Sequence, residues 1–268
     1  MLKRALTGAG FVVIMLGSIW AGPLATGILF LIIALTGLHE FYKLSGGNQH
    51  TSLPALMAGG ALTGGLLFYF GTANPPNEIL VFIPVILLGL FSIVLFGKQR
   101  PAFSATGILA AGILYLPISL FITAGSSLTA AGWEPRMLTG MLLIIWLYDT
   151  GAYVTGSKLG RTKLYPSVSP KKSVEGVAGG ALLALITAIL WANFTGLHDL
   201  EFWIVAWFLI CLTGTIGDLF ESQLKRSAGV KDSGNLLPGH GGILDRFDAM
   251  LFAGPFFTAW IVFYGWLM

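Results

Sequence analysis

Apolar runs of bilayer length dominate this sequence and restrict what it can fold into. An α-helix rises about 1.5 Å per residue, so about 20 apolar residues are needed to cross the hydrocarbon core of a membrane. Nine such runs predict an all-α, polytopic integral membrane protein with about nine transmembrane helices. We expect these helices near residues 5–21, 24–43, 53–71, 79–96, 103–124, 137–156, 174–194, 202–221 and 247–267.

The composition agrees with a membrane protein. Hydrophobic residues make up 55% of the 268 residues and charged residues only 10%. Water-soluble domains carry about 25% charged residues, so the sequence excludes an ordinary soluble fold. The single cysteine, Cys211, lies inside an apolar run, which excludes a disulfide within the chain and a cysteine-based zinc site.

The basic residues predict the orientation of the chain. With nine helices, 14 of the 15 Lys and Arg residues fall on one side of the membrane, and only Arg136 falls on the other. Lys and Arg accumulate in cytoplasmic loops. We therefore expect a multi-pass protein of the cell (inner, cytoplasmic) membrane, with its N-terminus in the cytoplasm and its C-terminus outside.

Charge is also concentrated along the chain. Residues 158–175 and 221–248 hold 14 of the 27 charged residues, and both segments face the cytoplasm in the predicted topology. Basic loops alone are explained by topology and by contact with anionic lipid. Topology and lipid contact do not explain the acidic residues that are interleaved with the basic ones in the second segment. We therefore expect the functional surface on this side of the membrane.

Two carboxylates interrupt apolar runs, namely Asp149 and Asp218. A charge at membrane depth costs about 2.5–3.5 kcal/mol, so such residues normally have a partner. Helical spacing puts Asp218, Ser222 and Lys225 on one face, with Glu221 beside them. An ion pair between Asp218 and Lys225 is the simplest structural explanation, but it leaves the neighbouring glycine-rich segment and the other acids unexplained.

The glycine-rich segment PGHGGILDRFD precedes the last helix. Its Pro and Gly residues prevent a regular helix, and Asp245 and Asp248 follow at the predicted helix start, where free N–H groups favour anions and phosphate. Acids beside such a helix end suggest a bridging Mg²⁺, which binds one or two carboxylates together with substrate phosphates. His240 serves either as a phosphate donor or general acid, or only to fix the loop. Scattered histidines argue against zinc.

Three short patterns follow one another in the second charged segment: Ser222-x-Leu224-Lys225-Arg226, then Lys231-Asp232-x-Gly234, then Leu237-Pro238-x-His240-Gly241-Gly242-x-x-Asp245-Arg246-x-Asp248. Together they resemble the signature of the phosphatidate cytidylyltransferases, also called CDP-diacylglycerol synthases. The segments DTGAYVTG from Asp149 and SPKKSVEG from Ser169 resemble further parts of that family. The resemblance covers roughly residues 140–250, and the first five helices match only in being apolar.

The resemblance implies that CTP and phosphatidic acid react to give CDP-diacylglycerol and pyrophosphate, with Mg²⁺, in the bilayer. It implies two metal ligands, Asp218 and Asp245. The implied catalytic residues are Asp149, Asp218, Lys225, Arg226, Asp245 and Asp248. The implied phosphate-binding residues are Lys171, Lys172, Ser222, Lys231, His240 and Arg246.

On this interpretation the chain divides into residues 1–136, an N-terminal transmembrane region of about five helices, and residues 137–268, a catalytic transmembrane region with cytoplasmic loops 157–173 and 222–246. We expect no nucleic-acid partner, and the sequence leaves a homodimer open. A membrane transporter of ions or lipids is the non-enzymatic alternative. A CDP-alcohol phosphotransferase is a weaker one, because the chain has no Asp-Gly dipeptide of the kind that leads that family's pattern.

Overall fold

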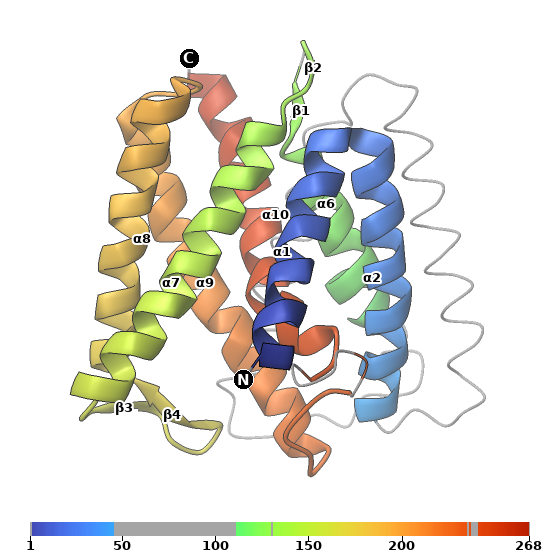
Figure 1. Cartoon of the computed structure of the whole chain (residues 1–268), viewed down its shortest axis with the longest axis vertical. Helices are drawn as coiled ribbons and strands as arrows, with labels where there is room; N and C mark the ends of the chain where they lie inside the picture. Colours follow the sequence, from blue (N-terminus) through green and yellow to red (C-terminus); the bar gives the residue numbers. More distant parts are fainter. Residues whose placement is uncertain (1, 46–110, 130, 235, 237–240, 268) are drawn as a thin grey trace.

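A computed structural model describes residues 2–45, 111–129, 131–234, 236 and 241–267 of the chain (Figure 1). Helices account for most of these residues, as the apolar runs predict. The helices are α1 (Leu2–Ala21), α2 (Pro23–Leu44), the π-helical turn η1 (Leu114–Ile118), α6 (Ser119–Gly125), α7 (Pro135–Leu159), α8 (Val174–Thr195), α9 (Leu200–Ser227) and α10 (Leu244–Leu267).

Five of these helices, α2, α7, α8, α9 and α10, are long and apolar enough to cross a membrane. This confirms the expected class, a helical protein with several helices of membrane-spanning length. The helices predicted near residues 53–71 and 79–96 lie outside the described residues.

Helix ends near the charged segments differ from the expected ones. Helix α9 continues to Ser227, past its predicted end at residue 221, and α10 begins at Leu244 instead of residue 247. Polar residues at the ends of both helices hide these turns from a count of apolar residues. Lys225 and Asp245 therefore lie in helical turns and not in a loop.

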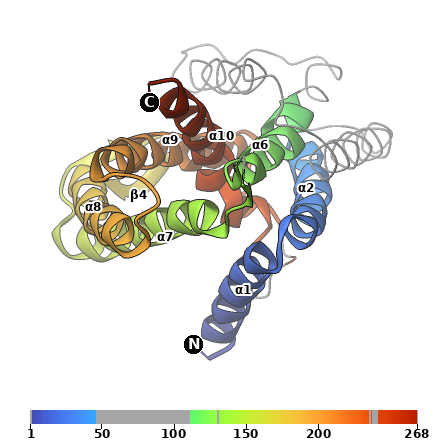
Figure 2. The same ribbon diagram turned by 90° about the horizontal axis from the view of Figure 1, so that it is seen from above.

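Two short antiparallel hairpins connect helices at opposite ends of the bundle. Strands β1 (Leu128–Thr129) and β2 (Gly132–Trp133) precede α7, and β3 (Lys163–Tyr165) and β4 (Ser169–Ser173) join α7 to α8. In Figure 1 the β1–β2 hairpin and the C-terminus are at the upper end, and the β3–β4 hairpin and the N-terminus are at the lower end. Figure 2 shows the helices end-on, with α7, α8 and α9 grouped on one side.

Glycines let α7 and α8 pack backbone to backbone. A Cβ atom added to Gly151 would stand 3.0 Å from the carbonyl oxygen of Gly179 and 3.1 Å from the Cα of Gly180. Small residues allow this close approach between membrane helices. The pair forms a rigid support for the hairpin that joins its two helices.

The outer surface of the bundle is apolar. On α8, Leu182, Leu190 and Phe194 have exposed fractions of 61%, 63% and 82%, whereas Trp203 and Phe257 are fully buried in the interior. Exposed apolar side chains of this kind mark a surface that contacts lipid or another protein, and their position on a helix of bilayer length favours lipid. The helical faces thus match the bilayer that the sequence predicts.

Charged residues at the upper end serve as local helix caps. Asp199 accepts a hydrogen bond from Phe202 N at 2.9 Å and from the Tyr264 hydroxyl at 2.5 Å. The bond from Tyr264, followed by that from Phe202 N, lowers the pKa of Asp199. Glu134 pairs with Arg136 at 2.7 Å. Asp199 and Glu134 are thus bound by neighbouring protein groups, which favours a structural role for them over ligand binding.

The two hairpin turns allow a direct test of sidedness. With Cys211 replaced by Ala, we expect cysteines at Ala131 and at Ser167, both exposed, to be labelled from opposite sides of the membrane by an impermeant thiol reagent. The excess of Lys and Arg at the lower end predicts that Ser167→Cys is labelled only after permeabilisation of cells. Labelling of both positions in intact cells would contradict this topology.

Candidate functional site

A pocket of about 510 Å³ opens at the lower end of the bundle, between α7, α8, α9 and the β3–β4 hairpin. Three lysines from the hairpin and two carboxylates from the helices face it. The residues around it are Tyr148, Asp149, Ala152, Tyr153, Gly156 and Ser157 from α7, Lys163, Lys171, Lys172 and Ser173 from the hairpin, Gly176 and Val177 from α8, and Asp218 from α9.

The hairpin is held in place by the start of α8. Ser173 caps this helix by accepting a hydrogen bond from Gly176 N at 3.1 Å. Glu175, in the first turn, accepts bonds from the backbone N–H groups of Arg161 and Thr162 at 3.0 and 3.1 Å. Because these contacts fix both ends of the hairpin, its lysines project from a defined backbone.

Opposite charges meet across the pocket. Lys172 forms an ion pair with Asp218, and Ser222 Oγ donates to Asp218 Oδ1 at 3.4 Å. Asp149 has Asp218, Lys172 and Arg246 as its electrostatic neighbours. Carboxylates of α7 and α9 therefore lie near two cations, Lys172 of the β3–β4 hairpin and Arg246 of α10.

Asp248 belongs to the same charged region. Its electrostatic neighbours include Asp218, Glu221 and Asp149. The structure thus brings three of the predicted catalytic acids together, namely Asp149, Asp218 and Asp248. They come from α7, α9 and α10, which are separate in the sequence.

Lys225 lies in a second, more deeply buried cluster. Its Nζ is 2.5 Å from Glu221 Oε2 and 2.6 Å from Asp245 Oδ1. The side chain of Glu221 is fully buried and that of Asp245 is 9% exposed. The ion pair considered from the sequence, Asp218 with Lys225, does not form, because Lys225 binds these two acids and Asp218 binds Lys172.

Asp245 ties the glycine-rich loop to α10. Besides Lys225 on Oδ1, its Oδ2 accepts hydrogen bonds from Ser233 N at 2.9 Å and Gly242 N at 2.8 Å, and lies 3.0 Å from Ser233 Oγ. Both oxygens are therefore engaged by the protein itself. This carboxylate supports the loop in the described structure.

Sequence reasoning missed a third buried acid, Glu40 of α2. Its Oε1 accepts from Ile243 N at 3.0 Å, and its Oε2 accepts from Leu244 N at 3.0 Å and Ser233 Oγ at 2.8 Å. The start of α10, which we expected to offer free N–H groups to phosphate, is thus already bound by an internal anion. A carboxylate in an apolar run, the signal that identified Asp149 and Asp218, could have identified Glu40 as well.

The other predicted residues occupy exposed positions at the lower end. Arg226 is exposed and donates to the carbonyl oxygen of Val230 at 3.0 Å. Lys171, Lys231 and Arg246 are also exposed. His240 lies outside the described residues. Several residues that line the pocket, Tyr153 and Lys163 among them, were not among the predicted site residues.

The donor chemistry around Asp218 suits a hard divalent cation. Its neighbours Asp149 and Asp248 supply carboxylate oxygens, which Mg²⁺ prefers. Within the described part of the chain, no three His, Cys, Asp or Glu side chains converge as a preformed metal site. Mg²⁺ commonly takes only one or two carboxylates and completes its shell with water and substrate phosphates, so the residues fit a substrate-dependent site.

Comparison with known proteins places the chain in a family. The model of a family described as the cytidylyltransferase family matches residues 2–264. A phosphatidate cytidylyltransferase of Bacillus subtilis is 34% identical over 263 residues, covering 96% of each chain. One from Staphylococcus aureus is 32% identical over 262 residues, covering 95% of this chain and 96% of that protein. One from Staphylococcus epidermidis is 47% identical over 122 residues, and that match spans about half of the relative, 46% of its length.

The buried cluster around Lys225 predicts a large effect on stability. Lys225→Met leaves Glu221 and Asp245 without their shared cation, and removing one partner of a buried ion pair costs about 3–5 kcal/mol. We expect a decrease of that size in the free energy of unfolding, measured by SDS titration with tryptophan fluorescence. Lys231→Met, at an exposed position, should change it by less than about 0.5 kcal/mol. Equal unfolding of the two variants would contradict the role of this cluster.

Proposed function

The chain belongs to the cytidylyltransferase family, and we propose that it transfers CMP from CTP to phosphatidic acid, giving CDP-diacylglycerol and pyrophosphate. The observation that carries this proposal is the pocket of three lysines and two aspartates at the end of an apolar helical bundle. One substrate is water-soluble and the other is a lipid. A charged pocket where transmembrane helices end is accessible to both.

We assign the nucleotide to this pocket. Its volume of about 510 Å³ lies within the range of small-molecule sites. Lys163, Lys171 and Lys172 supply positive charge for the triphosphate. Tyr153, whose side chain is 77% exposed, offers an aromatic face on which a base can stack.

The reaction requires neutralisation of negative charge more than it requires a protein nucleophile. Both substrates are anionic, and the lipid phosphate attacks the α-phosphorus of the nucleotide while pyrophosphate leaves. Preorganised cations lower the barrier to such transfers by stabilising charge in the transition state. Lys172 and Arg246, which interact with the acids of the pocket, are placed to supply this charge.

Mg²⁺ is the proposed cofactor, and it would neutralise phosphate charge and orient the nucleotide phosphates. We assign Asp218 as the principal protein ligand, with Asp149 and Asp248 as its neighbours in the same charged region. Asp245 is the other ligand that the resemblance implies. In the described structure its Oδ1 is paired with Lys225, so it would exchange that lysine for the ion.

The remaining proposals concern the membrane. We propose about nine transmembrane helices in the cell membrane, with the N-terminus and the pocket in the cytoplasm and the C-terminus outside. The N-terminus and the β3–β4 hairpin, whose lysines line the pocket, lie at one end of the bundle and the C-terminus lies at the other, which supports this arrangement (Figure 1). Whether the chain forms a homodimer is decided by its mass in detergent.

The function is tested with purified protein in detergent. We expect pyrophosphate release with phosphatidic acid, Mg²⁺ and CTP, and at least tenfold less with ATP, GTP or UTP. We also expect no release when phosphatidic acid is omitted. Absence of turnover with CTP, or equal turnover with all four nucleotides, would contradict the proposal.

Replacement of Asp218 tests whether activity depends on the pocket and not only on the charge of the surface around it. Asp218→Asn keeps the shape of the side chain but removes the charge that binds Lys172 and the proposed ion. We expect kcat to fall by at least about a hundredfold, a typical cost of losing a charge-stabilising group in a transfer reaction. Glu201→Gln, at the upper end of α9, is the control and should retain kcat within about twofold. A retained kcat in Asp218→Asn at saturating Mg²⁺ would remove Asp218 from the catalytic residues.

A further inference from the structure

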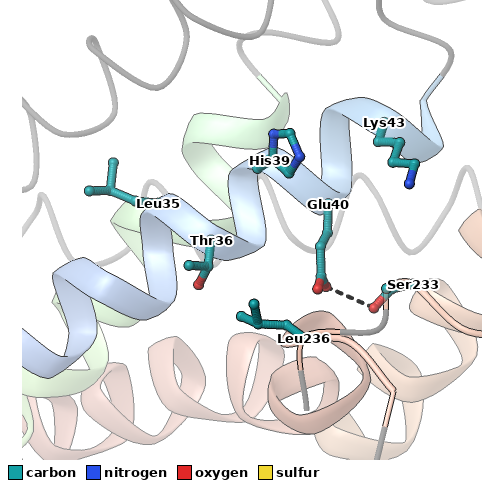
Figure 3. Close-up of a pocket in the computed structure, with 8 residues that line it drawn as sticks. Leu35, Thr36, His39, Glu40, Lys43, Ser233 and Leu236 are labelled. Atoms are coloured by element: carbon teal, nitrogen blue, oxygen red, sulfur yellow. Dashed lines mark hydrogen bonds between the residues drawn. The ribbon is translucent and has the colours of Figure 1, made fainter. Parts of the chain in front are cut away.

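Glu40 connects the first part of the chain to the start of α10. It projects from α2 toward the loop that carries Ser233, at the edge of a second cavity of about 510 Å³ (Figure 3). The residues that it binds, Ser233, Ile243 and Leu244, are 193 to 204 positions away in the sequence. Its side chain is nevertheless almost completely buried.

The hydrogen bonds of Glu40 leave little freedom for α10. The first N–H groups of a helix have no partner inside the helix. Here the N–H groups of Ile243 and Leu244 are bound by Glu40, and that of Gly242 is bound by Asp245. A Cβ atom on Gly242 would collide with Ser233 Oγ and with both oxygens of Glu40, so the contact is tight as well as polar.

Ser233 links the two carboxylates. Its hydroxyl oxygen is 2.8 Å from Glu40 Oε2 and 3.0 Å from Asp245 Oδ2. A hydroxyl has one proton, so it donates to only one of them at a time. Glu40 keeps two backbone donors in either case, and Asp245 keeps two backbone donors and Lys225. The three residues therefore form one restraint between α2, the loop and α10.

This restraint acts on residues of the proposed site. Arg246 and Asp248 lie two and four positions after Leu244 on α10, and both interact electrostatically with Asp149. Both residues follow the first turn of α10 directly, so a rotation of that turn about the helix axis carries both side chains with it and moves them relative to Asp218. A residue that fixes this turn fixes their position.

We propose that Glu40 is a positioning residue for cytidylyl transfer, which holds the first turn of α10 so that Arg246 and Asp248 stay within electrostatic reach of Asp149. The inference rests on the proposed function, and it assigns a part in the reaction to a helix of the N-terminal region. Glu40 itself does not contact the reacting groups. Its effect is therefore expected on the rate of transfer more than on substrate binding.

Three substitutions test the proposal. In Glu40→Gln, the amide oxygen can still accept from one of the two backbone N–H groups, but the NH₂ group meets the other, Ile243 N or Leu244 N, and cannot accept its hydrogen bond. We expect kcat to fall at least tenfold, while KM for CTP and for phosphatidic acid changes less than threefold. Glu40→Asp keeps the charge on a shorter side chain and should recover part of the lost kcat. Glu40→Ala should resemble Glu40→Gln, provided that it folds.

Glu134→Gln is the matched control, because it removes the charge of a glutamate at the opposite end of the bundle, where Glu134 pairs with Arg136. It should keep the wild-type kcat. Activities are compared for the monodisperse fraction from size-exclusion chromatography, so that loss of folded protein does not count as loss of kcat.

Hydrogen exchange gives a measurement that is independent of activity. In Glu40→Gln we expect at least tenfold faster exchange in peptides covering residues 241–247, with unchanged exchange in residues 178–190 of α8. A wild-type kcat in folded Glu40→Gln, or unchanged exchange at 241–247, would overturn the proposal. Lack of CTP-dependent turnover in the unmutated protein would instead overturn the proposed function, and the exchange measurement would still decide whether Glu40 restrains α10.

Discussion

Burial of compensated charge is the constraint on which the lower end of this protein depends. Lys225 lies between Glu221 and Asp245, with both of its contacts at hydrogen-bond distance and all three side chains largely buried. Charges near membrane depth are costly unless they are paired and their remaining hydrogen bonds are satisfied. Ser233 and the backbone of the glycine-rich loop supply those bonds for Asp245. The end of α9, the loop and the start of α10 thus form one unit.

The charged segments contain two kinds of acid, which differ in their surroundings. Asp245 is 9% exposed and its partners are Lys225 and the backbone around the glycine-rich loop. Asp218 is 30% exposed, pairs with Lys172 and lines a pocket together with lysines of the β3–β4 hairpin. Lys225 and Lys172 differ in the same way, the first buried between acids and the second at the pocket. Charged residues that look alike in the sequence therefore divide into those that support the loop and those that line the pocket.

The apolar runs predicted the described helices because helix length is set by the thickness of the bilayer. They did not predict the polar last turn of α9 or the β3–β4 hairpin, since neither shows an apolar period. Asp149, Asp218 and Asp248 could be selected from the sequence by their charge and by resemblance. Their partners could not, because the pairing of Asp218 with Lys172 depends on how α9 packs against the hairpin. A choice between Lys225 and Lys172 requires the tertiary structure.

Glu40 shows the same limit over a longer distance. Its position in an apolar run signals a buried charge, but the sequence does not indicate which of the later segments satisfies it. The answer, the first turn of α10, follows from the geometry of a helix start, where N–H groups without internal partners attract an anion. Since the nearest acid of α10 itself binds Gly242, the next two N–H groups are left for a carboxylate from another helix. Helix α2 provides it, so the N-terminal region, which the family model also matches, supports the end of the helix that carries Arg246 and Asp248.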